Sequence, residues 1–193
     1  MPLILASSSS IRHDILCAAG VEFEVVQSSV DEREAKSRLG AADDIAAELS
    51  AAKAISVSCA RPEGWVIGSD SVVSVAGRMF DKPRDRQEAA EHLRFFSGKP
   101  MALSSAVALA RGGELDWRHV DTAILHVREL SDGFIKTYLD AEWPEVGYTV
   151  GVFRLEGRGV QLFSSIEGDH FTVLGMPLIP LLGALRERGL LAA

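Results

Sequence analysis

Residues 65–71 read Trp-Val-Ile-Gly-Ser-Asp-Ser, an apolar run that ends in a carboxylate between two hydroxyl groups. Such a run predicts a buried β-strand over Trp65–Gly68 that ends at Ser69–Ser71, with Val72–Val75 continuing in an extended conformation. A carboxylate at the tip of a buried strand costs free energy unless a cation lies beside it. Asp70 is therefore a candidate to bind a divalent metal or to activate a water, and a simple turn cap is the alternative.

A second junction of strand and helix lies near the start of the chain. Leu3–Ala6 predicts a short buried strand, and Ser7–Ser10 then leads into a helix that we expect to end near Ala19, before Gly20. Small hydroxyl residues at such a junction leave backbone N–H groups free, and a helix N-terminus attracts anions. Arg12 would add a charged donor to a phosphate. An ordinary serine cap followed by a solvated arginine is the alternative.

Lys82 is the third candidate, because it stands immediately before Pro83 in a chain with few lysines. The proline biases Lys82 toward an extended backbone, so that its ammonium group projects in a defined direction. A lone surface lysine is the alternative at this position.

The rest of the chain alternates between helical and strand patterns. We expect strands over 23–26, 101–110 and 115–127, helices over 43–59, 85–96, 131–139 and 177–188, polar irregular chain over 28–34, and a loop over 145–159. Asp85–Glu88 fits a capping box, Ser131 fits a helix cap, and Arg111–Gly113 predicts the turn of a long hairpin. This order predicts an α/β fold with a mixed twisted sheet and flanking helices. No repeat or linker is apparent, so we expect residues 1–193 to form a single domain.

Composition excludes several classes of protein. The 193 residues carry a net charge of −7, and 47% of them are hydrophobic, which excludes a disordered chain and argues against a protein that coats nucleic acid. Apolar stretches are too short to cross a membrane, and the N-terminus lacks a signal-peptide pattern. Cys17 and Cys59 show no disulfide or metal spacing, so we expect two reduced, mostly buried thiols. We also expect a cytoplasmic protein without a membrane partner.

Familiar catalytic motifs are absent from the sequence. Ser97–Pro100 is similar to the end of a P-loop, but Leu93 stands where that motif requires glycine. The five histidines show no HExxH spacing, which argues against a zinc site, and Ser7–Ser10 lacks the GxSxG pattern of a serine hydrolase.

Taken together, these segments resemble the Maf family of nucleoside triphosphate pyrophosphatases. The matching motifs are LILASSSSIRHDIL at 3–16, VDER at 30–33, ELSAAKA at 48–54, VIGSDSVV at 66–73, FDKPRDRQEA at 80–89 and VGVFRLEGRGVQLFSSIEGDHFTVLGMPLIPLL at 150–182. The resemblance implies two lobes around a deep cleft, often in a homodimer. It also implies metal-dependent hydrolysis of a nucleoside triphosphate to the monophosphate and pyrophosphate.

The resemblance also implies roles for individual residues. Asp70 matches the catalytic aspartate that accepts a proton from the attacking water, and Glu32 matches an acidic residue that holds the metal with it. The positions that match phosphate-binding residues are Ser7, Ser9, Arg12, Lys53 and Lys82. Carboxylate and phosphate oxygens suit Mg²⁺ or Mn²⁺, which would neutralise the leaving pyrophosphate and lower the pKa of a bound water.

Three positions that influence base choice in the family depart from its usual pattern. Ile11 replaces an arginine, Ser71 stands where threonine or glutamine is common, and Glu156 replaces a glutamine. A carboxylate only accepts hydrogen bonds, so Glu156 suits the N1–H and 2-amino donors of guanine better than a pyrimidine. We therefore favour a purine substrate such as 7-methyl-GTP over dTTP or UTP. Two alternatives are open: Glu156 caps a loop, or the protein is a non-catalytic nucleotide sensor in cell division.

Overall fold

The computed structural model describes residues 2–32 and 40–192. In chain order, its elements are β1 (Leu3–Leu5), α1 (Ser10–Ala18), β2 (Glu24–Val25), α3 (Ala42–Ala60), β3 (Trp65–Val75), β4 (Arg78–Phe80), α4 (Arg86–Phe96), β5 (Pro100–Arg111), β6 (Glu114–Val127), α5 (Asp132–Glu142), the 3₁₀ helices η1 (Glu145–Tyr148) and η2 (Arg158–Leu162), β7 (Phe163–Glu167), α6 (His170–Val173) and α7 (Leu178–Glu187).

Within these described residues, seven strands form one mixed sheet in the order β2-β1-β3-β5-β6-β7, with β4 paired to β3. β1 pairs in parallel with β2 and β3, whereas β4 and β7 pair antiparallel with β3 and β6. The predicted α/β fold with a mixed sheet and flanking helices is confirmed. The chain divides into two compact units, the first made of Met1–Ser71, Ser104–Thr122 and Asp169–Ala193, the second of Val72–Leu103 and Ala123–Gly168.

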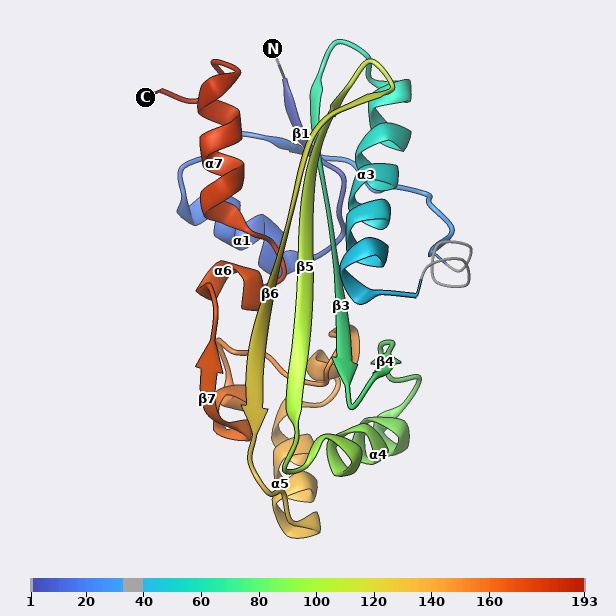
Figure 1. The fold of residues 1–193 in the computed structure, drawn as a ribbon, viewed down its shortest axis with the longest axis vertical. Helices are drawn as coiled ribbons and strands as arrows, with labels where there is room; N and C mark the ends of the chain where they lie inside the picture. Colours follow the sequence, from blue (N-terminus) through green and yellow to red (C-terminus); the bar gives the residue numbers. More distant parts are fainter. Residues whose placement is uncertain (1, 33–39, 193) are drawn as a thin grey trace. The chain divides into compact units, whose positions relative to one another are not determined.

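In the first unit, α1 and α7 lie on one side of the strands and α3 lies on the other (Figure 1). Strand side chains alternate between two apolar cores. Leu5 and Ile67 lie in the core that contains the buried residues of α1 and α7. Ala6 and Val66 lie in the core that contains Ala51, Ala54 and Val57 of α3. Because successive side chains of a strand point to opposite faces, this alternation decides which residues of β3 meet each layer of helices.

In the second unit, aromatic side chains surround His92. The ring centroids of Phe80 and His92 lie 5.0 Å apart, and those of Phe96 and His92 lie 5.8 Å apart. The Nδ1 atom of His92 is buried and has no hydrogen-bond partner within the described part of the chain. Desolvation lowers the pKa of His92 below its ordinary 6.5. The groups that modify this effect are Glu88, Glu91 and Asp81, which raise the pKa, and Arg78, which lowers it.

This environment predicts a loss of stability in mild acid. When the pH falls below about 6.5, the unfolded chain takes up a proton at residue 92 more readily than the folded chain, so the free energy of unfolding falls. A series of urea unfolding curves between pH 8 and pH 5 measures this. We expect the free energy of unfolding to fall less steeply with pH in His92→Phe. An equally steep fall in that variant would show that protonation of His92 is not the cause.

Both predicted side-chain helix caps are present in the structure. Asp85 accepts a hydrogen bond from the Glu88 backbone N–H at 2.8 Å, and Ser131 accepts one from the Phe134 backbone N–H at 3.2 Å. In a capping box, Glu88 would also accept from the backbone N–H of the N-cap residue Asp85. Here Glu88 instead accepts from the backbone N–H of Arg84, at 2.6 Å. The part of the predicted irregular segment that falls on residues 33–34 lies outside the described residues.

Two sequence predictions are wrong. β3 is continuous from Trp65 to Val75, so Asp70 lies in the middle of a strand instead of at its tip. Pairing with β4 keeps the later part of this strand extended. Cys17 and Cys59 are exposed, because α1 and α3 turn other residues toward their cores. The short elements β4, β7 and α6 were not predicted, because three to five residues show no clear period.

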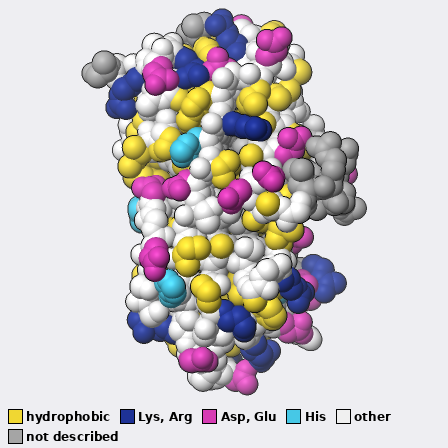
Figure 2. Space-filling view, in the orientation of Figure 1, with side chains coloured by type: hydrophobic (Ala, Val, Ile, Leu, Met, Phe, Trp, Pro, Cys, Tyr) yellow, Lys and Arg dark blue, Asp and Glu magenta, His cyan; other side chains and the backbone are white. Residues whose placement is uncertain are grey.

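The exterior shows two further features. No helix within residues 2–32 and 40–192 is both long and apolar enough to span a membrane. Acidic and basic side chains are interspersed on the face drawn in Figure 2.

Candidate active site

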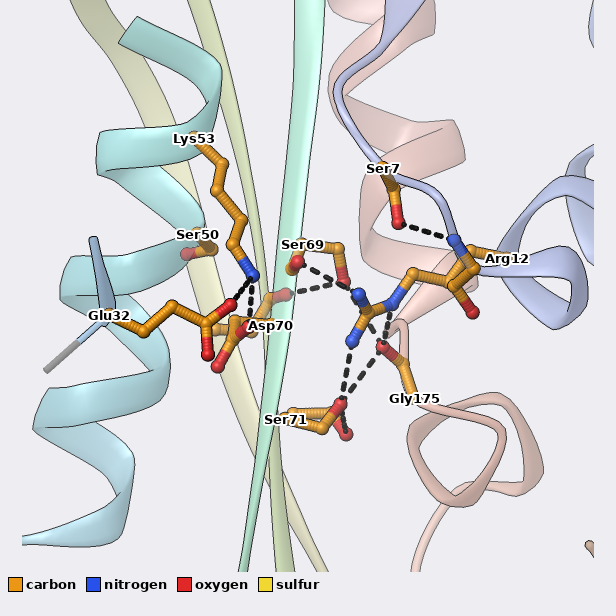
Figure 3. A network of polar contacts seen from close by, with 12 residues as sticks. Ser7, Arg12, Glu32, Ser50, Lys53, Ser69, Asp70, Ser71 and Gly175 are labelled. Atoms are coloured by element: carbon orange, nitrogen blue, oxygen red, sulfur yellow. Dashed lines mark hydrogen bonds and ion pairs between the residues drawn. The ribbon is translucent and has the colours of Figure 1, made fainter. Parts of the chain in front are cut away.

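Asp70, Lys53 and Glu32 form a compact charged cluster in the first unit (Figure 3). The Nζ atom of Lys53 donates to Asp70 Oδ1 at 2.5 Å and to Glu32 Oε1 at 2.8 Å. The side chains of Lys53 and Asp70 are only 12% and 10% exposed, and that of Glu32 is 43% exposed. One ammonium group therefore pairs with two carboxylates, and it is the cation that a buried Asp70 requires.

A close approach of α3 to β3 brings these groups together. A Cβ atom built on Gly68 would lie 2.1 Å from the carbonyl oxygen of Ser50 and 2.7 Å from the backbone nitrogen of Ala54. Only glycine fits at this contact. Lys53 directly precedes Ala54 on α3, and Asp70 is two residues beyond Gly68 on the same face of β3. The small residues therefore place the lysine within reach of the aspartate.

Arg12 lies on the opposite face of β3 (Figure 3). Its Nε donates to the carbonyl oxygen of Gly175 at 3.0 Å, its Nη1 to the carbonyl oxygen of Ser69 at 3.0 Å, and its Nη2 to Ser71 Oγ at 3.1 Å. Desolvation lowers the pKa of Arg12, and the negative charges of the cluster across the strand raise it. The guanidinium remains charged, since the ordinary pKa of arginine lies far above neutrality.

A network of hydroxyl groups extends from Arg12. Ser71 Oγ donates to the carbonyl oxygen of Gly175 at 3.1 Å and lies 3.0 Å from Ser105 Oγ. Ser105 in turn donates to the carbonyl oxygen of Thr172 at 2.8 Å. The hydroxyl of Ser71, predicted to influence base choice, is thus bonded to neighbouring chain segments on this face.

The other predicted residues of the first unit flank this network at the start of α1. The Ser9 backbone N–H donates to Ser7 Oγ at 3.2 Å. Ser9 is the N-cap residue of α1, but its side chain makes no cap hydrogen bond. Ile11 packs, partly buried, against the core shared with α7.

Lys82 and Glu156 belong to the second unit. Lys82 is exposed in the segment that joins β4 to α4. Glu156 Oε1 accepts a hydrogen bond from Arg154 Nε at 3.2 Å, and the Glu156 side chain is 39% exposed.

Sequence reasoning missed Gly68, Gly175 and Ser69. Gly68 carried a usable signal, because a glycine inside a strand often marks a close backbone approach. Gly175 has a φ of +94°, which favours glycine after the short helix α6. Ser69 carried no such signal, because its role depends on a carbonyl group 106 residues away in sequence.

The charged cluster fits a hard divalent cation completed by substrate oxygens. Magnesium is usually held by one or two carboxylates together with substrate phosphates and water. Asp70 and Glu32 provide such a pair around one ammonium group. Within residues 2–32 and 40–192, no group of three or more His, Cys, Asp or Glu side chains could hold a metal. The donors described therefore suit magnesium or manganese with bound substrate better than a closed zinc site.

The sequence profile of the Maf-like protein family matches residues 2–188. The chain belongs to the Maf family. Among curated relatives of this Maf-family chain, the 7-methyl-GTP pyrophosphatase of Rhizobium meliloti (strain 1021) is 47% identical over 195 residues, which cover 99% of this chain and 98% of that protein. The nucleoside triphosphate pyrophosphatase of Nitrobacter hamburgensis is 46% identical over 193 residues, covering 99% and 96%.

Among solved structures, the Staphylococcus aureus Ham1 protein superposes on this Maf-family chain with a TM-score of 0.46 and 15% identity, covering 98% of this chain and 100% of that one. The family assignment predicted from the motifs is confirmed by the profile and the curated relatives.

Proposed function

We propose that this protein is a nucleoside triphosphate pyrophosphatase that releases a nucleoside monophosphate and pyrophosphate, with Asp70 as the catalytic base. The observation that carries the proposal is the buried contact of Lys53 Nζ with Asp70 Oδ1 at 2.5 Å and with Glu32 at 2.8 Å. Relatives at 47% and 46% identity whose names state this activity support it.

In the proposed reaction, water attacks the α-phosphorus of the substrate. The bond from this phosphorus to the oxygen that bridges to the β-phosphorus breaks, and its electron pair leaves with pyrophosphate. Asp70 Oδ1 accepts from Lys53, whereas Asp70 Oδ2 accepts no hydrogen bond from any described residue. Asp70 Oδ2 is therefore the atom that takes the proton of the attacking water. Lys53 holds the carboxylate in the orientation that this transfer needs.

Cationic and hydroxyl groups would bind the triphosphate. Lys53 and Lys82 are the proposed partners of the phosphate oxygens, since an ammonium group stabilises charge that builds up on them in the transition state. Ser7 and Ser9 lie at the N-terminus of α1, where free backbone N–H groups and the helix dipole favour an anion.

Asp70 and Glu32 are the residues that would hold Mg²⁺ or Mn²⁺. When bound, a divalent ion supplies positive charge to the departing pyrophosphate. The oxygen character of both ligands supports this assignment, and their shared contact with Lys53 places the two carboxylates close together.

A panel of nucleoside triphosphates, with methylated purines included, tests the activity. We expect monophosphate and pyrophosphate to appear in equal amounts when Mg²⁺ or Mn²⁺ is present, as resolved by ion-exchange chromatography. Diphosphate with orthophosphate would overturn the reaction. Tight nucleotide binding without turnover under either metal would favour a nucleotide sensor instead.

For the base, we propose a purine, with 7-methyl-GTP as the first candidate. Glu156 supports this, because its carboxylate offers acceptors to the N1–H and 2-amino groups of guanine. Among the described residues Glu156 accepts one hydrogen bond, from Arg154, which leaves acceptor sites on the carboxylate, and its side chain is partly exposed. The name of the Rhizobium meliloti relative is consistent with this choice.

Glu156→Gln should shift activity toward pyrimidine nucleotides. An amide both donates and accepts, so it can pair with the imide N–H and the neighbouring oxygens of uracil or thymine. We expect the ratio of kcat/KM for UTP to that for 7-methyl-GTP to rise about tenfold, equivalent to about 1.4 kcal/mol. Glu145→Gln, at an exposed position of the same unit, is the matched control. An unchanged substrate ranking in Glu156→Gln would refute this role.

A further inference from the structure

The side chains of β3 around Asp70 point to two opposite faces. Asp70 meets Lys53 on the α3 face, whereas Ser69 and Ser71 direct their hydroxyl groups to the face that carries Arg12 (Figure 3). This follows from the period of two along a strand. Arg12 and the carboxylate of Asp70 are therefore separated by the backbone of β3.

Arg12 forms hydrogen bonds with the residues on both sides of Asp70. Its Nη1 donates to the carbonyl oxygen of Ser69 at 3.0 Å, and its Nη2 donates to Ser71 Oγ at 3.1 Å. Its Nε donates to the carbonyl oxygen of Gly175 at 3.0 Å. Three of the five guanidinium N–H groups are thus committed to three different oxygens, and the planar group ties α1, β3 and the segment before α7 together.

The carbonyl oxygen of Gly175 is the common acceptor of this arrangement. It accepts from Arg12 Nε, from Ser69 Oγ at 3.1 Å and from Ser71 Oγ at 3.1 Å. Ser69 Oγ also lies 2.8 Å from the carbonyl oxygen of Ala106 on β5. Ser69 is therefore held through its main chain and its side chain, and Ser71 is held through its side chain.

We propose that Arg12 is a positioning residue that holds the residues on both sides of Asp70, Ser69 through its backbone and Ser71 through its side chain, and that it is not a principal ligand of the phosphates. This differs from the role that the family resemblance implies for Arg12, and it rests on the proposed function of Asp70. A displacement of a catalytic group by about 1 Å can lower the reaction rate about 100-fold. A residue that holds Asp70 in position therefore affects kcat. A phosphate ligand would instead contribute strongly to nucleotide affinity.

The test separates affinity from turnover in Arg12→Gln and Arg12→Lys. We expect kcat for 7-methyl-GTP, or for the best nucleotide of the panel, to fall about 100-fold in both variants. The affinity for an analogue with a methylene group between the α- and β-phosphorus should change by less than about threefold. Lysine at position 12 should not restore kcat, because one ammonium group cannot reproduce the planar guanidinium that donates to three acceptors. Arg61→Gln is the matched control at an exposed surface ion pair.

A tenfold or larger loss of analogue affinity in Arg12→Gln, partly restored in Arg12→Lys, would overturn the proposal in favour of a phosphate ligand. Ser71→Ala provides a milder variant if Arg12→Gln does not fold. We expect Ser71→Ala to lower kcat about fivefold with unchanged affinity. Where Arg12→Gln folds, we expect Ser71→Ala to add little further loss in that background. Fully additive losses in the double variant would also overturn it.

A measurement without turnover distinguishes failure of this inference from failure of the proposed function. Native-state amide hydrogen exchange should become faster across residues 69–72 of β3 in Arg12→Gln but not in Arg61→Gln. Unchanged exchange in Arg12→Gln would refute the positioning role even in an active enzyme. Faster exchange in a protein that hydrolyses no nucleotide would refute the proposed function alone.

Discussion

Asp70→Asn should reduce the rate of pyrophosphate release about 1,000-fold while the protein stays folded. The amide of asparagine can still accept a hydrogen bond from Lys53, so the contact that holds the side chain survives. What the variant loses is the oxygen that takes a proton from the attacking water, and general base catalysis typically contributes 10²- to 10⁴-fold. Initial rates of pyrophosphate release at saturating substrate measure the effect.

Asp14→Asn is the control for this substitution. Asp14 lies on α1 with a side chain that is 69% exposed, and its carboxylate pairs with the neighbouring His13. We expect the control to keep the wild-type rate and melting temperature. If Asp70→Asn retained more than a tenth of the wild-type rate with the fold intact, Asp70 would not be the base.

The sequence was informative wherever an apolar pattern met a polar residue. Leu3–Ala6 and Trp65–Gly68 predicted buried strands because short apolar runs next to polar junctions have few other structures available. Asp70 drew attention for the same reason, since a carboxylate among buried residues needs a cation. The identity of that cation did not follow from the pattern. Lys53 lies 17 residues earlier on a helix rich in alanine, where the residues alone give a lysine no distinguishing feature.

Contacts distant in sequence account for most of what the pattern could not predict. The carbonyl oxygen of Gly175 accepts from Ser71, 104 residues earlier, and no local preference of either residue encodes that bond. The predicted grouping of Arg12 with Lys53 around phosphate came from the family resemblance. The structure places the two on opposite faces of β3, a consequence of strand periodicity that the motifs do not express.

Gly68→Ala should damage both stability and activity. The added Cβ atom would lie 2.1 Å from the Ser50 carbonyl oxygen and 2.7 Å from the Ala54 backbone nitrogen, so backbone atoms of α3 must move away from β3. Overpacking of this kind costs about 3 kcal/mol in the free energy of unfolding. Lys53 is carried on the same turn of α3, so its ammonium group would retreat from Asp70. We expect kcat to fall about 100-fold.

Gly183→Ala is the matched control for this substitution. Gly183 lies within α7, and a Cβ atom there would meet nothing within 4 Å. The same added methyl group should therefore raise the free energy of unfolding by about 0.5–1 kcal/mol, because alanine favours a helix interior. Urea unfolding and initial rates well below the unfolding midpoint separate lost stability from a displaced lysine. If the free energy of unfolding of Gly68→Ala lay within about 0.5 kcal/mol of the wild-type value, the close packing of α3 on Gly68 would not be what sets the Lys53–Asp70 contact.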